Sequence, residues 1–296
     1  MKLRMKSGIA AACLAAALMV AGAAQARVVE EQFTLPVKVE DAYGKHIEQP
    51  IVVTVFVDDA LPGPKPIIVI NHGRSAEPEK RATMGRARFA DTSRWFASQG
   101  FIVGVPTRIG YGERGGEDVE SSGGCLKANY SPGFIAAATQ VVATLDVLRE
   151  RPDALKDRAV VLGQSYGGAT TTAVAAMNPP GVVAAINFAG GAGGDPQTHA
   201  REPCSQAQLK RVFQRLGAVA KVPMLWLYTE NDQYFGASYP RQWNEAYVAA
   251  GGQAEFIQFP PHGEDGHQLF VKFPQTWKPV VAEFLRKHGF DIKDAP

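Results

Sequence analysis

The amino-acid sequence predicts an α/β fold: a doubly wound, mostly parallel sheet with helices on both faces and antiparallel strands at its N-terminal edge. First, apolar strand-like runs alternate with helix-like stretches along most of the chain. Second, runs such as PIIVI at 66–70 are continuously apolar and β-branched, which is typical of strands buried on both faces. Third, two strand-like stretches precede the alternating part and predict the antiparallel edge.

The elements follow from these patterns in chain order. Strands are expected over 31–39 and 51–57, and Gly44 and Pro50 between them predict a hairpin. LPGPKP marks a turn before the buried strand at 66–70. A helix over 81–99, a strand over 101–106 and a helix over 134–149 come next. The remaining strands are predicted over 159–164, 182–190, 222–230 and 254–260, and the remaining helices over 168–177, 206–220, 241–250 and about 277–287.

Two segments do not fit the alternation. They lie near 110–132, which is rich in glycine and charge, and near 190–205, which reads GGAGGDPQTHAREPCS after Ala189. We interpret both as long loops inserted after strands of a single domain over 27–296. In open α/β sheets, loops beyond the carboxyl ends of the strands build the functional site.

The first 26 residues predict a signal peptide that is removed. A basic start at Lys2, Arg4 and Lys6 precedes an apolar run from 9 to about 20, and the small-x-small pattern AQA ends at Ala26. The run is shorter than the ~20 residues that span a bilayer. No later segment is expected to cross a membrane, so the mature protein is expected in the periplasm or outside the cell.

Charge and cysteines narrow the function further. Without the signal peptide the chain has 28 basic and 29 acidic residues, a formal net charge of −1. Such a balance argues against nucleic acid or an anionic membrane as partner. The two remaining cysteines, Cys125 and Cys204, predict a disulfide in an oxidising compartment. Neither a CxxC motif nor zinc-ligand spacing occurs, so no metal site is expected. The sequence does not indicate an oligomeric state.

Ser165 is the candidate nucleophile. It lies in Gly163-Gln164-Ser165-Tyr166-Gly167, a G-x-S-x-G motif between a predicted strand and a predicted helix. A hydroxyl presented on such a sharp turn requires small residues two positions before and after it, because side chains there would collide. The helix N-terminus behind the serine favours developing negative charge.

A serine nucleophile needs a base and a group that orients the base. His267 and His262 share the loop after the last strand, and we prefer His267, with His262 as the alternative. Asp232 follows the strand at 222–230 and is preferred as the acid to Glu230, which still belongs to the strand end.

Two backbone N–H groups are expected to form an oxyanion hole. One belongs to Tyr166, directly after the nucleophile, and the other to Arg74, in the loop after the strand at 66–70. The candidates for lining the pocket are Tyr111, Arg114, Tyr234 and Phe235.

The motifs INHGRS, GQSYGG, TENDQY and GEDGHQLF together resemble the α/β-hydrolase superfamily, and within it the dienelactone-hydrolase-like group. The resemblance runs from about Ile51 to Phe290, and the order Ser165, Asp232, His267 agrees with it. Dienelactone hydrolases carry a cysteine nucleophile, whereas this chain has Ser165. The resemblance therefore implies a serine esterase with an acyl-enzyme intermediate, a small-molecule ester as substrate, and no cofactor.

Three other functions stay open at this point. One is a small-peptide peptidase of the prolyl-oligopeptidase type, which uses the same three residue types. Another is an acyltransferase, and the last is a binding protein on a hydrolase fold that has lost its activity.

Overall fold

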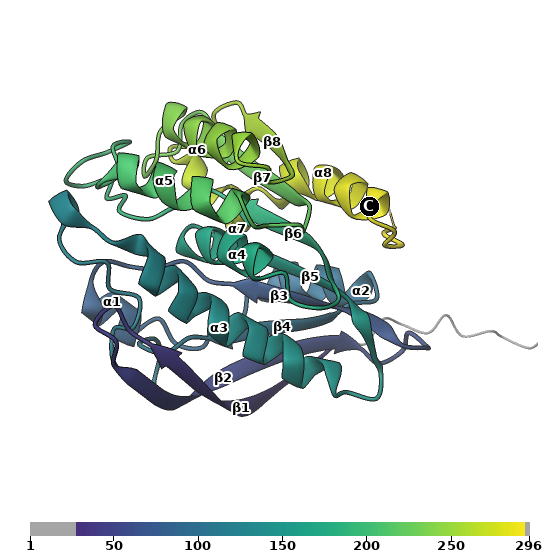
Figure 1. The fold of residues 1–296 in the computed structure, drawn as a ribbon. Coiled ribbons are helices and arrows are strands. Elements are labelled where there is room, and N and C mark those ends of the chain that lie inside the picture. Colours follow the sequence, from purple (N-terminus) through teal and green to yellow (C-terminus); the bar gives the residue numbers. More distant parts are fainter. Residues whose placement is uncertain (1–27, 294–296) are drawn as a thin grey trace, which may run out of the picture.

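The computed structural model describes residues 28–293, so the signal peptide expected over 1–26 lies outside the described residues. One eight-stranded sheet runs through them, in the order β1-β2-β4-β3-β5-β6-β7-β8 (Figure 1). The strands are β1 Val28–Glu40, β2 His46–Asp58, β3 Lys65–Asn71, β4 Ile102–Thr107, β5 Ala154–Gln164, β6 Val182–Phe188, β7 Met224–Thr229 and β8 Ala254–Phe259.

Strands β3 to β8 are parallel to one another, whereas β1 pairs antiparallel with β2 and β2 with β4. The predicted sheet and its antiparallel N-terminal edge are therefore confirmed. Pro50 is not a break between strands, as the sequence suggested, but lies within β2 opposite Pro36. The pairing of β2 with β4 covers only Val52–Phe56, so Pro50 lies where β2 has a free edge on that side and proline is tolerated.

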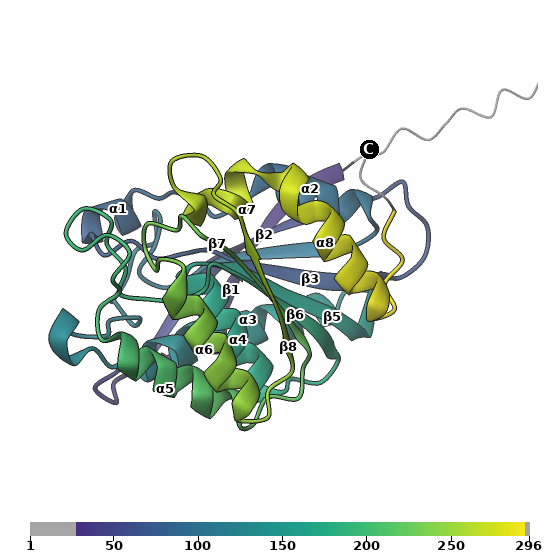
Figure 2. The ribbon, with the colours of Figure 1, turned by 90° about the horizontal axis from the view of Figure 1, so that it is seen from above.

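Helices cover both faces of the sheet (Figure 2). One face carries α3 Tyr130–Arg149, α4 Tyr166–Met177, α5 Gln206–Gly217 and α6 Ser238–Ala249, and the other carries α2 Ala90–Ser98, α7 Leu269–Lys272 and α8 Pro274–Lys287. The short helix α1 spans Pro78–Ala82, and single 3₁₀ turns span Cys125–Lys127 (η1) and Gly266–Gln268 (η2).

The continuous apolar runs fill two cores. In β3, Ile67 and Val69 belong to the apolar cluster under α3 to α6, while Ile68 and Ile70 belong to the cluster under α2, α7 and α8. Successive side chains of a strand point to opposite faces, so a strand covered on both sides has to be apolar throughout. This is the physical reason why the strand predictions held.

The predicted helix over 81–99 is wrong in its first half. Helix α1 ends at Ala82, and α2 begins only at Ala90. Gly85 between them has φ +71°, a left-handed conformation that ends a helix. The backbone of Ala87 bonds instead to two strands, accepting from Thr54 Oγ1 and donating to Thr107 Oγ1. Tertiary hydrogen bonds therefore override the helical pattern of this segment.

Helix α3 departs from the expectation that no later segment could cross a membrane. Among the described helices, it alone is long and apolar enough by length and composition. However, 56% of its most apolar window is buried inside the protein, where it packs on the sheet and beside α4. The apolar character of α3 is thus explained by its place in the core.

The two predicted loops are present, although α3 begins at Tyr130 and shortens the first. The first follows β4 and the second follows β6, and the expected disulfide between Cys125 and Cys204 joins them. Because β3 and β5 lie between β4 and β6 in the sheet, the joined loops cross above the ends of those two strands. The site is built at that edge.

Candidate active site

Ser165 lies in the one-residue turn between β5 and α4, with φ +58° and ψ −126°. A non-glycine residue adopts this backbone conformation only at an energetic cost, and such strain is concentrated at functional sites. A Cβ at position 163 would collide with the carbonyl of Gly167, and one at position 167 with the carbonyls of Asn71 and His72. The spacing of the two glycines around Ser165 is therefore required by close packing of β3, β5 and α4.

Asp232 and His267 form a buried pair. Asp232 lies just after β7, and its Oδ2 is 2.9 Å from Nδ1 of His267, which lies in η2 after β8. Both side chains are buried, Asp232 completely. The other carboxylate oxygen of Asp232 accepts from the backbone N–H groups of Tyr234 at 2.8 Å and Phe235 at 2.9 Å. With its Nδ1–H donated to the carboxylate, His267 keeps Nε2 as a proton acceptor.

Aromatic rings fix the plane of the imidazole. Tyr234 stacks on the His267 ring with centroids 4.1 Å apart, and Phe235 packs edge-on at 5.3 Å. The backbone carbonyl of His267 accepts from Nε2 of Gln164 at 2.9 Å. Gln164 immediately precedes Ser165, so this bond ties the histidine loop to the serine turn. Within residues 28–293, Ser165 Oγ itself has no hydrogen bond.

His262, the alternative base, has a different environment. Its Nδ1 contacts the carbonyl of Pro260 at 2.8 Å and its Nε2 contacts Thr276 Oγ1 at 3.0 Å. Both ring nitrogens are thus used within the loop and at α8. The structure brings Asp232 together with His267 and leaves His262 apart from it. Glu230, the acid that we ranked second, is exposed after the end of β7.

The loop after β3 passes beside the serine. A Cβ built at Gly73 would lie 3.2 Å from the Ser165 Cβ and 3.7 Å from its Oγ, so a side chain at this position would press on the serine. Tyr166 is the first residue of α4, where N–H groups have no partner in the helix. In the described part of the chain, neither the N–H of Tyr166 nor that of Arg74 donates a hydrogen bond. Both are free to bind an anion.

Buried charges that the sequence analysis missed hold this loop. Arg108, just after β4, is fully buried and donates to the carbonyls of His72 at 2.9 Å and Gly73 at 3.5 Å. Its Nε donates to Glu120 Oε1 at 2.5 Å, and the hydroxyl of Tyr111 donates to Glu120 Oε2 at 2.6 Å. The carbonyl and the N–H of one peptide unit point in opposite directions. His72 Nδ1 holds the Gly73 carbonyl at 2.8 Å and Arg108 contacts it at 3.5 Å, so the two side chains together set the direction of the Arg74 N–H.

A second charged contact involves the side chain of Arg74. It donates two parallel bonds of 2.7 Å to Asp118, which also pairs with Arg81 at 3.0 Å. Burial opposes ionisation of Asp118, but the bonds from Arg74 and the charge of Arg81 hold its pKa below the ordinary value.

The imidazole of His72, in the same loop, is also perturbed. Burial, followed by the charge of Arg108, lowers the pKa of His72 well below its ordinary value.

Ser165 opens on a cavity of about 380 Å³. Its walls come from the loop after β3 and from both inserted loops, and they include Arg74, Asp118, Cys125, Tyr130, His199, Cys204, Tyr234 and Phe235. Two of the four pocket candidates, Tyr234 and Phe235, are thus in the lining. The other two are not: Tyr111 is buried against Arg108, and Arg114 bonds to Thr34 in β1. A larger hollow of about 710 Å³, near the β1–β2 turn and α3, includes none of the candidate site residues.

Comparisons with known proteins agree with this fold. A model of the dienelactone hydrolase family matches residues 79–271. A putative dienelactone hydrolase from Klebsiella pneumoniae has a similar structure, with a TM-score of 0.58 at 15% identity, over 88% of this chain and 99% of that chain. An acetyl xylan esterase from Paenibacillus sp. R4 is similar at 0.58 and 17% identity, over 89% of each chain.

An acylaminoacyl peptidase from Pyrococcus horikoshii gives a TM-score of 0.64 at 14% identity. The match covers 92% of this chain but only 43% of the peptidase, so this chain spans less than half of that enzyme. No curated protein sequence matches the chain. At these identities the structural likenesses show a common fold, and the choice of substrate has to be argued from the site.

Proposed function

The chain belongs to the dienelactone hydrolase family, and from this premise we propose that it is a secreted serine hydrolase that cleaves carboxylic esters. Ser165 is the nucleophile, His267 the base and Asp232 the residue that orients the base. The observation that carries the proposal is the buried Asp232–His267 pair, tied through Gln164 to the strained serine turn. Such a constellation is defined by its geometry and roles.

In the proposed reaction, Nε2 of His267 takes the proton of Ser165 while Oγ attacks the ester carbonyl. The N–H groups of Tyr166 and Arg74 bind the oxyanion, and each such donor is typically worth ~3 kcal/mol in the transition state. His267 then protonates the leaving alcohol, and water cleaves the acyl-enzyme by the same route. The hydrogen bond between Oγ and Nε2 is expected to form when substrate binds, as is common in unliganded enzymes.

Export is part of the proposal. The first 26 residues have the pattern of a signal peptide, and the Cys125–Cys204 disulfide is compatible with an oxidising compartment. We therefore expect the mature protein in the periplasm or the medium, with Arg27 at its amino terminus.

The deciding experiment uses that mature protein and the Ser165→Ala variant. Hydrolysis of p-nitrophenyl acetate is expected to fall by roughly 10⁴-fold or more, because the covalent route is removed. Ser98→Ala, which removes a hydroxyl at the end of α2 on the opposite face of the sheet, is the matched control and keeps the wild-type rate. Turnover of Ser165→Ala near the wild-type rate would exclude the proposed nucleophile.

Two further substrates separate esterase from the alternatives. A peptide p-nitroanilide tests amide cleavage, and an added alcohol acceptor tests acyl transfer. Faster cleavage of the anilide than of the ester would assign a peptidase instead, and a transesterified product as the main product would assign a transferase.

A further inference from the structure

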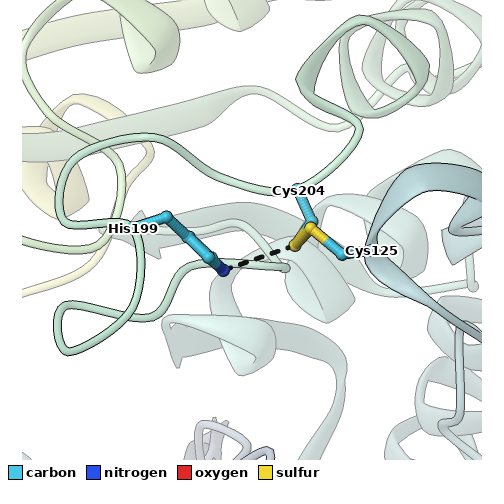
Figure 3. A group of neighbouring side chains, drawn as sticks. All are labelled: Cys125, His199 and Cys204. Carbon is cyan, nitrogen blue, oxygen red and sulfur yellow. Dashed lines mark hydrogen bonds between the residues drawn. A yellow bond between two sulfur atoms is a disulfide. The ribbon is translucent and has the colours of Figure 1, made fainter.

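A histidine outside the proposed triad lies against the disulfide. His199 Nε2 is 3.5 Å from Sγ of Cys204, and the imidazole points to the sulfur pair (Figure 3). The ligating atoms of Cys125, His199 and Cys204 all lie within 4.8 Å of one another. Because both sulfurs are bonded to each other, the group offers a sulfur–sulfur bond beside an imidazole rather than two thiolates.

The two sulfur-bearing residues differ in accessibility. Cys125 is exposed at the start of η1, where the following Leu126 is 94% exposed. Cys204 is half-buried, and its backbone is held by the carbonyl of Gly193 at 2.8 Å and the hydroxyl of Tyr130 at 2.5 Å. Cys125 is therefore the more accessible of the two residues to a reagent from solvent.

The position of His199 is also fixed. The backbone N–H of His199 donates to the carbonyl of Asp195 at 3.0 Å, which closes a tight turn. Its Nδ1 is buried and has no hydrogen-bond partner in the part of the chain that the structure describes. With the proton on Nε2, the ring donates to Cys204 Sγ and leaves Nδ1 as an unpaired acceptor. The imidazole thus contacts the sulfur of Cys204 and makes no hydrogen bond to that of Cys125 in the described residues.

From this asymmetry we propose that the Cys125–Cys204 bond is a thiol-exchange site, at which a low-molecular-weight thiol adds to Cys125 while Cys204 leaves toward His199. The thiolate attacks Cys125 Sγ, a new sulfur–sulfur bond forms there, and the Cys125–Cys204 bond breaks. Its electron pair stays on Cys204 Sγ, which accepts the hydrogen bond of His199 Nε2–H and afterwards takes a proton from solvent. One disulfide replaces another, so no further oxidant or reductant is needed.

Chemistry favours this direction. Exchange is faster when the leaving sulfur is stabilised as a thiolate, and its rate depends on which sulfur is accessible. An N–H that donates a hydrogen bond to the leaving sulfur stabilises it as a thiolate. The imidazole of His199 contacts Cys204, and Cys125 is the residue more exposed to solvent. Each sulfur is thus suited to one of the two roles.

The exchange site adjoins the proposed active site. Cys125, His199 and Cys204 line the same cavity as Ser165, and the disulfide joins the two loops above it. After exchange the loops remain connected through Ser205 Oγ, which donates to the carbonyl of Cys125 at 2.6 Å. The cavity wall is then loosened rather than removed. This consequence rests on the proposed function, whereas the exchange itself does not.

The test follows the exchange by mass. The native protein is incubated with 2-mercaptoethanol, quenched with acid and iodoacetamide at early times, and mapped by peptide mass spectrometry. We expect the mercaptoethanol adduct on Cys125 and the alkyl group on Cys204. In denaturant both cysteines should carry the adduct in comparable amounts, because the selectivity comes from the fold. An adduct on Cys204 in the native protein would overturn the proposal.

Variants isolate the role of His199. His199→Gln and His199→Ala are expected to slow the exchange on the order of tenfold. His288→Gln, at the end of α8 and against Phe284, is the matched control and keeps the wild-type rate. Thermal unfolding of each oxidised variant checks that the fold is retained. If folded His199 variants exchange as fast as wild type, the imidazole has no part in the reaction.

Activity forms a separate arm. In the Cys125→Ser/Cys204→Ser double variant, the ratio of kcat/KM for p-nitrophenyl octanoate to that for the acetate should rise several-fold, because the wall is looser. The exchanged protein should behave likewise. An unchanged ratio in an active variant would refute the effect on the cavity. A wild-type protein that cleaves neither ester would refute the proposed function and leave the mass result to stand by itself.

Discussion

At the scale of single residues, the two oxygens of Asp232 have separate roles. One accepts two backbone N–H groups, from Tyr234 and Phe235, and the other faces His267 Nδ1. The backbone bonds fix the carboxylate, so that only one orientation of its second oxygen is left for the imidazole. A buried carboxylate with no spare freedom is well suited to select a single tautomer of its partner.

Asp232→Asn tests this role. To keep accepting from the two backbone N–H groups, the amide must turn its NH₂ toward His267 Nδ1. Nδ1 then has to accept, and the proton moves to Nε2, where it blocks the base. We expect kcat for p-nitrophenyl acetate to fall by roughly 10³- to 10⁴-fold with little change in KM. A decrease of less than about tenfold would contradict the role, and the half-buried residue Asp41, directly after β1, provides the matched Asp41→Asn control.

The choice between His267 and His262 shows what sequence could predict at this scale. Position in the loop favoured His267, and the contact of that residue with Asp232 agrees with it. The reason that His262 is not free, its bond to Thr276 in α8, depends on a contact between distant segments and leaves no trace in the local pattern. Catalytic roles for all three residues stay predictions until variants are measured.

At the scale of elements, the strands were predictable because burial on both faces forces a continuous apolar run. The segments that connect strands and helices were less predictable from the sequence. The segment over 83–89 has apolar residues at helical spacing, yet Gly85 and the hydrogen bonds of Ala87 keep it irregular. The Arg108–Glu120 pair escaped notice because it joins the end of β4 to the middle of a loop. Charged residues in a glycine-rich segment are expected to face solvent, and only the fold shows that Arg108 and Glu120 are buried.

Arg108→Lys tests whether that pair positions the loop after β3. Lysine keeps the charge but not the planar fork that reaches Glu120 and the His72 carbonyl together. We expect kcat to fall about tenfold with KM nearly unchanged, because the oxyanion donor is displaced. Affinity for a boronic acid that mimics the tetrahedral intermediate should fall in parallel.

The control for this variant is Arg86→Lys, since Arg86 bonds to Glu30 and Thr54 away from the cavity. Both variants should be assayed well below their unfolding temperatures. If Arg108→Lys raises KM at constant kcat, or leaves binding of the boronic acid intact, the pair has a structural role only.

At the scale of the whole molecule, a buried neutral imidazole makes stability depend on pH. The pKa of His72 is lowered by burial and then by the charge of Arg108, whereas in the unfolded chain it returns to the ordinary 6.5. Below pH 6.5, His72 binds a proton in the unfolded chain but stays neutral in the folded protein. His72 therefore does not lower the free energy of unfolding above pH 6.5. The free energy of unfolding decreases as the pH falls from 6.5 toward the lowered pKa.

The expected slope from His72 is up to ~1.4 kcal/mol per pH unit. Unfolding by urea at pH 7.5, 6.5 and 5.5 should show it in the wild type and less of it in His72→Gln. His288, whose pKa burial also lowers, is partly exposed and contributes less, so His288→Gln serves as the comparison. Equal slopes in wild type and His72→Gln would show that another group governs this range.

The order of strands separates two kinds of work. The segments proposed to carry the reaction follow β3, β5, β7 and β8, while the two long loops that add further wall to the cavity follow β4 and β6. Apart from the residues that hold Arg74 and Arg108, the two long loops can therefore diverge or lengthen while the reacting atoms keep their places. For an engineer, the same division marks 121–129 and 190–205 as the stretches to randomise when a new specificity is wanted from an unchanged reaction, with Tyr111, Asp118 and Glu120 retained.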